Sequence, residues 1–226
     1  MDSACPAASP ILVTGGTGYL GFPLVSALVA RGRRVRVLCR ERSTGRVAPG
    51  ARPVVGDALA ADSVAAALPD GATLVHLVGT PHPSPSKASE FLRVDLASIE
   101  AGVAAAVARR AAHLVYVSVA HPAPLMRAYV AAREAGEAAI EGAGLTATIL
   151  RPWYVLGPGH WWPLPLVPIA WLLERIPATR DRARRLGFVT RRRMVDALVA
   201  AVLAPPPAGT RRILEVPAIR AARVPG

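Results

Sequence analysis

A cluster of glycines directly after a short apolar run constrains this chain more than any other feature. Residues 11–14 read Ile-Leu-Val-Thr, and Gly15, Gly18 and Gly21 follow them closely. The first glycine permits a tight turn, the second lets a ligand approach the backbone, and the third lets a helix pack closely on a sheet. This order predicts a pyrophosphate site at the helix N-terminus, where free N–H groups and the helix dipole favour an anion. The alternative is a glycine turn with a structural role alone.

Apolar runs and helical patterns alternate along the first two thirds of the chain. Short apolar runs indicate buried strands, and they occupy residues 11–14, 35–39, 52–55, 74–78, 114–119 and 146–150. Helical patterns lie between them at residues 19–30, 63–68, 89–110 and 125–141. This alternation predicts an α/β fold, namely a doubly wound parallel Rossmann sheet with helices on both faces.

We expect one dinucleotide-binding domain over residues 10–226, preceded by a flexible N-terminus at residues 1–9. A hydrophobic fraction of 52% suits one large core. Within the domain, residues 157–226 contribute a small C-terminal substrate cap and the last elements. The elements expected there are a strand at 186–189, a helix at 191–203 and a strand at 213–216.

The net charge of +12 does not by itself indicate a nucleic-acid partner. Lys87 is the only lysine, and the arginines are spread along the chain instead of forming a stripe interleaved with aromatic residues. The two cysteines and five histidines lack the spacing of metal ligands, with His76 expected in the core and His121 in a loop. The chain shows no signal-peptide pattern and no apolar run long enough to span a membrane. These observations predict a cytoplasmic protein without a metal site, a disulfide framework or bound nucleic acid.

Three further segments resemble one known family. Gly56-Asp57-Ala58 follows the third strand, Leu77-Val78-Gly79 ends the fourth, and residues 150–159 read LRPWYVLGPG. With the glycine turn, they resemble the extended and atypical short-chain dehydrogenases/reductases, which include NAD-dependent epimerase/dehydratase-like proteins. The chain is also similar to the nucleotide-binding accessory subunit of respiratory complex I. The resemblance implies a nicotinamide dinucleotide, NADP or NAD, held by Gly15, Thr17, Gly18, Tyr19, Leu20, Gly21, Arg40, Asp57, Ala58, Val78, Gly79, Arg133, Pro152 and Tyr154.

The residue after the second strand bears on which dinucleotide binds. A carboxylate there would accept a hydrogen bond from the ribose 2′-hydroxyl of NAD, whereas a cation would bind the 2′-phosphate of NADP. Arg40 takes this position, and its guanidinium suits a bidentate phosphate contact. We therefore expect NADP, while Glu41 one residue later keeps NAD open. The other alternative for Arg40 is a solvated loop arginine.

The catalytic groups of the family are only partly present. The resemblance implies a tyrosine as general acid/base, a lysine four residues later on the same helix face, and a serine or threonine after the fifth strand. Tyr129 occupies the tyrosine position, Arg133 replaces the lysine, and Ser118 lies one or two residues before the usual hydroxyl. The alternatives are a Tyr129 ring that packs on the sheet, a surface ion pair between Arg133 and Glu137, and a Ser118 hydroxyl bonded to backbone.

An apolar segment at residues 161–173 follows the GPG turn and contains three tryptophans and three prolines. We expect it to bury itself against the sheet. The alternative is a patch that meets a membrane or a partner, next to the arginines of residues 180–193.

The favoured function is an NAD(P)-dependent oxidoreductase that acts on a small apolar carbonyl or quinone-like compound. Tyr129, Arg133 and Ser118 would form its catalytic site. One alternative is a non-catalytic dinucleotide-binding sensor or accessory subunit, which the missing lysine favours. The other is a peripheral membrane protein of a respiratory or quinone pathway, at the inner face of the membrane.

Overall fold

The computed structural model describes residues 9–80, 84–123, 126–161 and 163–225. Its centre is a sheet of seven parallel strands in the order β3-β2-β1-β4-β5-β6-β9. The strands are β1 (Ile11–Thr14), β2 (Val35–Cys39), β3 (Arg52–Val55), β4 (Thr73–His76), β5 (His113–Val117), β6 (Ala147–Arg151) and β9 (Arg211–Glu215). From β1 the chain adds β2 and β3 toward one edge of the sheet. It then crosses back to the other side of β1 and adds β4, β5, β6 and β9 toward the opposite edge. This order confirms the predicted doubly wound Rossmann sheet.

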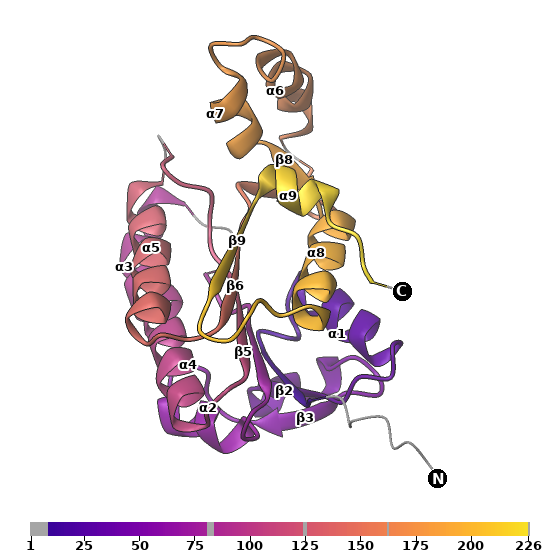
Figure 1. Cartoon of the computed structure of the whole chain (residues 1–226), viewed down its shortest axis with the longest axis vertical. Helices are drawn as coiled ribbons and strands as arrows, with labels where there is room; N and C mark the ends of the chain where they lie inside the picture. Colours follow the sequence, from indigo (N-terminus) through magenta and orange to yellow (C-terminus); the bar gives the residue numbers. More distant parts are fainter. Residues whose placement is uncertain (1–8, 81–83, 124–125, 162, 226) are drawn as a thin grey trace.

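Helices cover both faces of the sheet (Figure 1). One face carries α2 (Ala61–Ala67), α4 (Ala97–Ala108) and α5 (Arg127–Gly142), and the other carries α1 (Gly21–Val29), α8 (Arg191–Leu203) and α9 (Val216–Ala221). Successive side chains of a strand point to opposite faces, so β1 contributes to two cores. Ile11 and Val13 pack with α1 and α8, whereas Leu12 packs with α2 and α4. Because both faces are buried, the strands have nearly continuous apolar sequences.

The long helix predicted before β5 is continuous but changes its winding. It begins with a 3-10 turn (Pro85–Lys87) and continues through α3 (Ala88–Glu90) and a π-helical stretch (Phe91–Leu96) into α4. Phe91, Asp95 and Ile99 are spaced by four residues and are all buried. The π-helical stretch packs on α5. Such stretches are frequent at functional sites, and this one carries a buried carboxylate.

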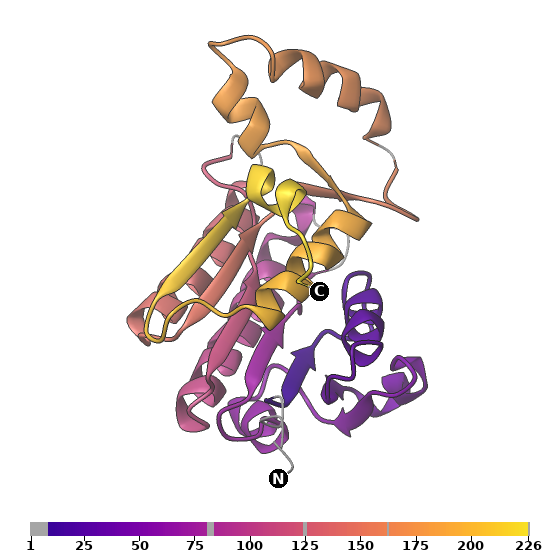
Figure 2. The ribbon, with the colours of Figure 1, turned by 45° about the vertical axis from the view of Figure 1, so that its right-hand side comes forward.

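The cap contains the strand predicted at residues 186–189, shifted by two residues at its start and one at its end, together with elements that were not predicted. β7 (Tyr154–Leu156) and β8 (Phe188–Thr190) pair in parallel as a second, two-stranded sheet. Between them lie a 3-10 turn (Leu164–Leu166), α6 (Val167–Leu173) and α7 (Arg180–Arg185). Both views show α6 and α7 projecting beyond the end of the main sheet (Figures 1 and 2). The prolines of this segment conceal α6 in the sequence, although Pro168 stands in its first turn, where its missing N–H disturbs no helical bond.

The connection from β6 to β9 carries the whole cap. β9 lies beside β6 and runs parallel to it, so the chain leaves β6, forms the cap and α8, and returns to the same sheet. The strands predicted at residues 11–14, 35–39 and 52–55 have the observed bounds, and the other predicted strands differ by one or two residues at their ends. The predicted flexible start, residues 1–9, lies outside the described residues except for Ser9.

Candidate functional site

A cavity of about 400 Å³ lies at the carboxyl end of the sheet. Its walls come from the glycine turn after β1, the segment after β4, the end of β5, the first turns of α5, and the segment that leads from β6 into the cap. The chain winds away from β1 and β4 in opposite directions along the sheet. The cavity therefore lies at the switch point where open α/β sheets bind their ligands.

The glycine turn forms one wall of this cavity. Gly15 has a positive φ of 75°, and a Cβ atom on it would lie 2.8 Å from the carbonyl carbon of Leu77. A Cβ atom on Gly21 would overlap the carbonyl oxygen of Gly15. Gly18 is exposed to the cavity, and its N–H donates to the Gly15 carbonyl over 3.0 Å. No side chain of the described chain caps the N-terminus of α1, so the turn fits the pyrophosphate of a dinucleotide.

Most residues predicted to bind the cofactor come together here. Those in the cavity wall are Gly15, Gly18, Tyr19, Leu20, Gly21, Gly79, Arg133, Pro152 and Tyr154. Thr17 and Val78 are sequence neighbours of wall residues but do not form the wall themselves. Arg40, Asp57 and Ala58 follow β2 and β3, the two strands next to β1, and lie outside the cavity.

Two exposed charged residues mark the β2–β3 end of the site. Arg40 follows β2 directly and precedes a 3-10 helix at Glu41–Arg46. Asp57 follows β3, and its Oδ1 accepts a hydrogen bond from the Leu59 N–H at 2.9 Å. An extended dinucleotide with its pyrophosphate at α1 would direct its adenosine half toward these strand ends.

Arg133 enters the cavity wall from α5 and is buried. Its Nη1 donates to the carbonyl oxygen of Val117 at 2.9 Å, and its Nη2 donates to Oδ1 of Asp95 at 2.6 Å. The guanidinium carbon lies 5.2 Å from the ring centre of Tyr129, one helical turn earlier. The surface ion pair considered for Arg133 and Glu137 is therefore wrong, because Arg133 turns inward and pairs with Asp95.

Asp95 fixes the position of this guanidinium. Its Oδ2 accepts hydrogen bonds from the N–H and the hydroxyl of Thr80, at 2.9 and 2.5 Å. Gly79 leaves the space that the guanidinium occupies, since a Cβ atom there would collide with Nη2 of Arg133. Burial by itself lowers the pKa of Arg133, because it disfavours the charged form. The nearby Tyr129, Tyr116 and Asp95 have a larger, opposite effect, so the pKa of Arg133 lies above its ordinary value.

Asp95 and Thr80 were not predicted as site residues from the sequence. One signal was available for Asp95, because an acidic residue on the same helical stripe as Phe91 and Ile99 needs a buried partner. The identity of that partner was not readable, since Arg133 lies on another helix and far along the chain.

Two hydroxyl-bearing residues reach the cavity near Arg133. Tyr129 is half-buried, and its ring packs edge-on against Phe91, with ring centres 5.1 Å apart. Ser118 follows β5 and is buried, and its Oγ makes no hydrogen bond to backbone among the described residues, while the carboxylate of Glu137 is near enough to interact with it. The alternative in which the Ser118 hydroxyl binds backbone is therefore wrong. Because Ser118 lies in the cavity wall, its hydroxyl can reach a ligand there.

Two of the histidines lie apart from this site. His76 is fully buried, with its ring nitrogens 3.0 Å from Oγ1 of Thr14 and 3.2 Å from Oγ of Ser98, which confirms a satisfied core residue. Burial and, to a smaller extent, Arg133 lower the pKa of His76 to about 3. His121 lies in the loop before α5 and pairs with Glu134 and Glu137 at 2.9 and 3.3 Å. It is not part of the cavity wall.

Aromatic rings form the cap side of the cavity. Its wall includes Tyr19, Trp153, Tyr154 and His160. The rings of Tyr19 and His160 have centres 4.5 Å apart, and the guanidinium carbon of Arg191 lies 5.2 Å from the Tyr19 ring centre. The sequence analysis did not single out Trp153 or His160 for this site, because the turn of the cap that brings them here was not recognised.

The apolar segment after the GPG turn does not bury itself as expected. Trp161, Ile169 and Trp171 are each at least half exposed, and α6 projects away from the sheet (Figure 2). Among the described residues, no helix is both long enough and apolar enough to cross a membrane. The same part of the chain contains no cluster of side chains that could hold a metal ion.

Fold and cavity together define a dinucleotide-binding Rossmann domain. The model of the NAD(P)H-binding family matches residues 15–157, and the chain belongs to this family, as an atypical short-chain dehydrogenase/reductase. The cofactor that this assignment identifies is a nicotinamide dinucleotide, and the glycine turn fits it. The family match spans all of the expected contact residues, from Gly15 to Tyr154.

Three similar proteins illustrate the relationship. A ketoreductase of a farnesylated quinoline oxide from Stigmatella aurantiaca is 32% identical over 64% of this chain and 50% of its own length. A ceramide reductase from Caulobacter vibrioides is 32% identical over 80% of this chain and 57% of its own length. The chain thus spans about half the length of these curated relatives. An NAD-bound short-chain dehydrogenase/reductase superfamily protein from Agrobacterium tumefaciens has the same fold, with a TM-score of 0.65 and 20% identity over 91% of this chain and 77% of its own.

Proposed function

We propose that this chain is an NAD(P)H-dependent oxidoreductase that reduces the carbonyl group of a small, apolar, quinone-like compound. The observation that carries the proposal is the convergence of the glycine turn, Tyr129 and Arg133 on one cavity. A dinucleotide with its pyrophosphate at α1 would direct its nicotinamide toward β5 and α5. The names of the curated relatives, both reductases, support the same class of reaction.

The reaction combines a hydride transfer with a proton transfer. The reduced nicotinamide supplies the hydride when it is bound. Tyr129 donates its hydroxyl proton to the substrate oxygen as a general acid. Arg133 stabilises the negative charge that develops on Tyr129, because its guanidinium lies 5.2 Å from the ring centre and remains charged. Ser118 donates a hydrogen bond from its hydroxyl, in the cavity wall, to the same substrate oxygen.

Arginine changes one part of this chemistry relative to the family's lysine. Two of the guanidinium nitrogens of Arg133 already donate to Asp95 and Val117. A guanidinium also does not release its proton. The proton that Tyr129 gives up therefore returns from water that enters the cavity, and Arg133 acts through its charge alone.

The cap side of the cavity favours a flat, apolar substrate. Tyr19, Trp153, Tyr154 and His160 present aromatic faces and edges on which a planar ring can stack. The dihydroquinoline oxide in the name of one relative contains such a ring, its fused benzene ring, next to a ketone. We therefore propose aromatic ketones and quinones as the substrate class.

NADPH is the proposed reductant, in preference to NADH. Arg40 is exposed at the end of β2, where a guanidinium can bind the 2′-phosphate with two hydrogen bonds. Glu41 follows it and is the group that would favour NAD instead.

The experiment is a titration of the purified chain with NADPH and NADH, followed by nicotinamide fluorescence, with Gly18→Asp as the control for the site. Turnover is then measured with aromatic ketones and quinones, for the wild type and for Tyr129→Phe. We expect binding that Gly18→Asp abolishes, and turnover that Tyr129→Phe lowers by about 10²–10⁴-fold without loss of binding. Tight binding with no turnover of any such compound would support the non-catalytic sensor or accessory subunit instead. Binding of neither nucleotide would overturn both alternatives.

A further inference from the structure

The cap carries a protruding arm, defined here as residues 163–185, which includes α6 and α7. Both ribbon views show it extending away from the sheet (Figures 1 and 2). Its base is held by Arg220 of α9, which donates to Oε1 of Glu174 at 2.9 Å and to the Phe188 carbonyl at 2.9 Å. α7 also packs on α9. The arm is therefore attached to the body at its base, while its tip stands clear of the body.

The arm exposes large apolar side chains together. Those exposed are Leu164, Leu166, Ile169, Trp171, Leu172, Leu173 and Ile176. Apart from the half-buried Val167, the described side chains of α6 are all exposed. A helix that is apolar on most of its sides is normally buried in a protein core or in lipid. A continuous apolar patch of this kind marks an interaction surface.

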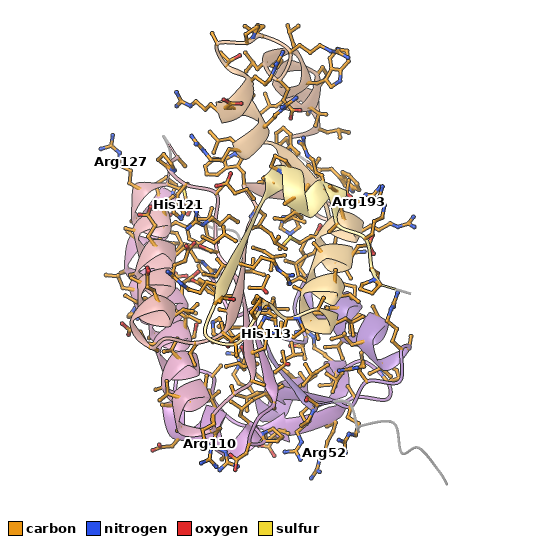
Figure 3. The ribbon with its side chains drawn as sticks, viewed as in Figure 1. Arg52, Arg110, His113, His121, Arg127 and Arg193 are labelled. Carbon is orange, nitrogen blue, oxygen red and sulfur yellow. The ribbon has the colours of Figure 1, made fainter. Side chains whose placement is uncertain are left out.

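Positive charge surrounds this apolar surface. The arm contains Arg175, Arg180, Arg182, Arg184 and Arg185, against the acidic residues Glu174 and Asp181. Glu174 is paired with Arg220. The guanidinium carbon of Arg175 lies 3.0 Å from the ring centre of Trp171, which places a cation at the edge of the apolar helix. Arg193, on α8 beneath the arm, points into solvent (Figure 3).

We propose that the arm docks on the surface of an anionic lipid bilayer. Its apolar side chains enter the boundary between headgroups and acyl chains, and its arginines bind headgroup phosphates. Charge complementarity selects this occupant, because a second copy of the chain would bring two positively charged arms together. Tryptophan beside arginine is also the side-chain chemistry of a membrane interface, where one end of each residue is apolar and the other polar.

The experiment is flotation of the purified chain with vesicles, either of phosphatidylcholine alone or of an equimolar mixture with phosphatidylglycerol. One variant, Arg182→Gln/Arg184→Gln, removes two charges from the arm. A matched variant, Arg52→Gln/Arg110→Gln, removes two exposed charges at the opposite end of the molecule (Figure 3). A third, Ile169→Ser/Leu172→Ser, removes apolar surface. Circular dichroism and NADPH binding show that each variant is folded, independently of lipid binding.

We expect the wild type to bind the mixed vesicles and to bind phosphatidylcholine alone far more weakly. Each arginine near an anionic surface strengthens binding about fivefold, so the arm-charge variant should bind about thirtyfold more weakly at low salt. The matched variant should bind nearly as well as the wild type, and the apolar variant should lose binding even at low salt. Equal losses in the two charge variants would overturn the proposal. So would a failure of the wild type to bind the mixed vesicles. If the chain then dimerises and Ile169→Ser/Leu172→Ser abolishes the dimer, the occupant is a second copy.

Discussion

The Asp95 carboxylate and the Arg133 guanidinium form a buried ion pair, with Oδ1 of Asp95 2.6 Å from Nη2 of Arg133. The pair joins the π-helical stretch before α4 to the first turns of α5, and so connects the two helices that flank the cavity on this face. Thr80 supplies two further hydrogen bonds to the same carboxylate. A hydrogen-bonded network of this kind holds a charged group in one position inside a protein.

Removal of one member of this pair should destabilise the fold strongly. Asp95→Ala leaves the Arg133 charge buried without its carboxylate, so we expect the free energy of unfolding to fall by about 3–5 kcal/mol. Urea unfolding followed by circular dichroism measures this change. The double variant Asp95→Leu/Arg133→Met removes both charges and should be clearly more stable than Asp95→Ala. If the double variant lost as much stability as the two single losses added together, the ion pair would not be the cause.

Gly21→Ala should disrupt the glycine turn. The added methyl group would overlap the carbonyl oxygen of Gly15, and this clash with backbone can be relieved only by a shift of α1. We expect a loss of about 1–3 kcal/mol in the free energy of unfolding and a loss of dinucleotide binding. Gly45→Ala is the matched control, because a Cβ atom on Gly45 meets open space. Calorimetric titration with NADPH reports binding, and unchanged binding in Gly21→Ala would show that the close contact is not needed.

Two buried histidines should make the fold sensitive to acid. Burial lowers the pKa of His76 to about 3 and that of His113 to about 4, each with a smaller contribution from a nearby arginine. An unfolded chain binds these protons near pH 6.5, whereas the folded chain does not. Stability is therefore full above about pH 6.5 and falls as the pH decreases toward 4, by about 1.4 kcal/mol per pH unit for each histidine.

Urea unfolding between pH 7 and pH 5 checks this dependence. The variant His113→Asn should be less stable than the wild type at pH 7, because it loses the bond to Thr148. Its stability should also fall less steeply with acid, since one of the two titrating groups is gone. Identical slopes for the variant and the wild type would argue against a role for His113.

Arg40→Ala should separate the two dinucleotides. A hydrogen-bonded contact between a guanidinium and a phosphate contributes about 1.5–3 kcal/mol, so NADPH affinity should fall about 10–100-fold. NADH has no 2′-phosphate, and its affinity should stay within about threefold of the wild type. Fluorescence titration with both nucleotides measures the ratio. Equal changes for the two nucleotides would assign Arg40 to the solvated loop, and a loss of NADH binding in Glu41→Gln would favour NAD.

The sequence predicts the sheet well and the cap poorly, for different physical reasons. A parallel strand covered on both faces must be apolar along most of its length. Runs such as residues 11–14 and 35–39 can therefore be recognised as buried strands from the sequence. The helix α6 is short and rich in proline, and its exposed apolar residues resemble those of a buried segment. The Asp95–Arg133 pair depends on the packing of two helices. No local pattern contains that information, so the sequence placed Arg133 in the site by resemblance alone and left a surface ion pair with Glu137 as the alternative.

Because the cap lies between β6 and β9, it is separate in the sequence from the glycine turn, and each can change without the other. The glycine turn, with Tyr19, belongs to β1 and α1, whereas Trp153, Tyr154 and His160 belong to a connection whose two ends are fixed on the sheet. Doubling the length of such a loop costs only about 0.6 kcal/mol in closure entropy. Insertions and replacements between residues 152 and 190 can therefore reshape the aromatic wall of the cavity and the arm, while the glycine turn and the strands that position it stay unchanged.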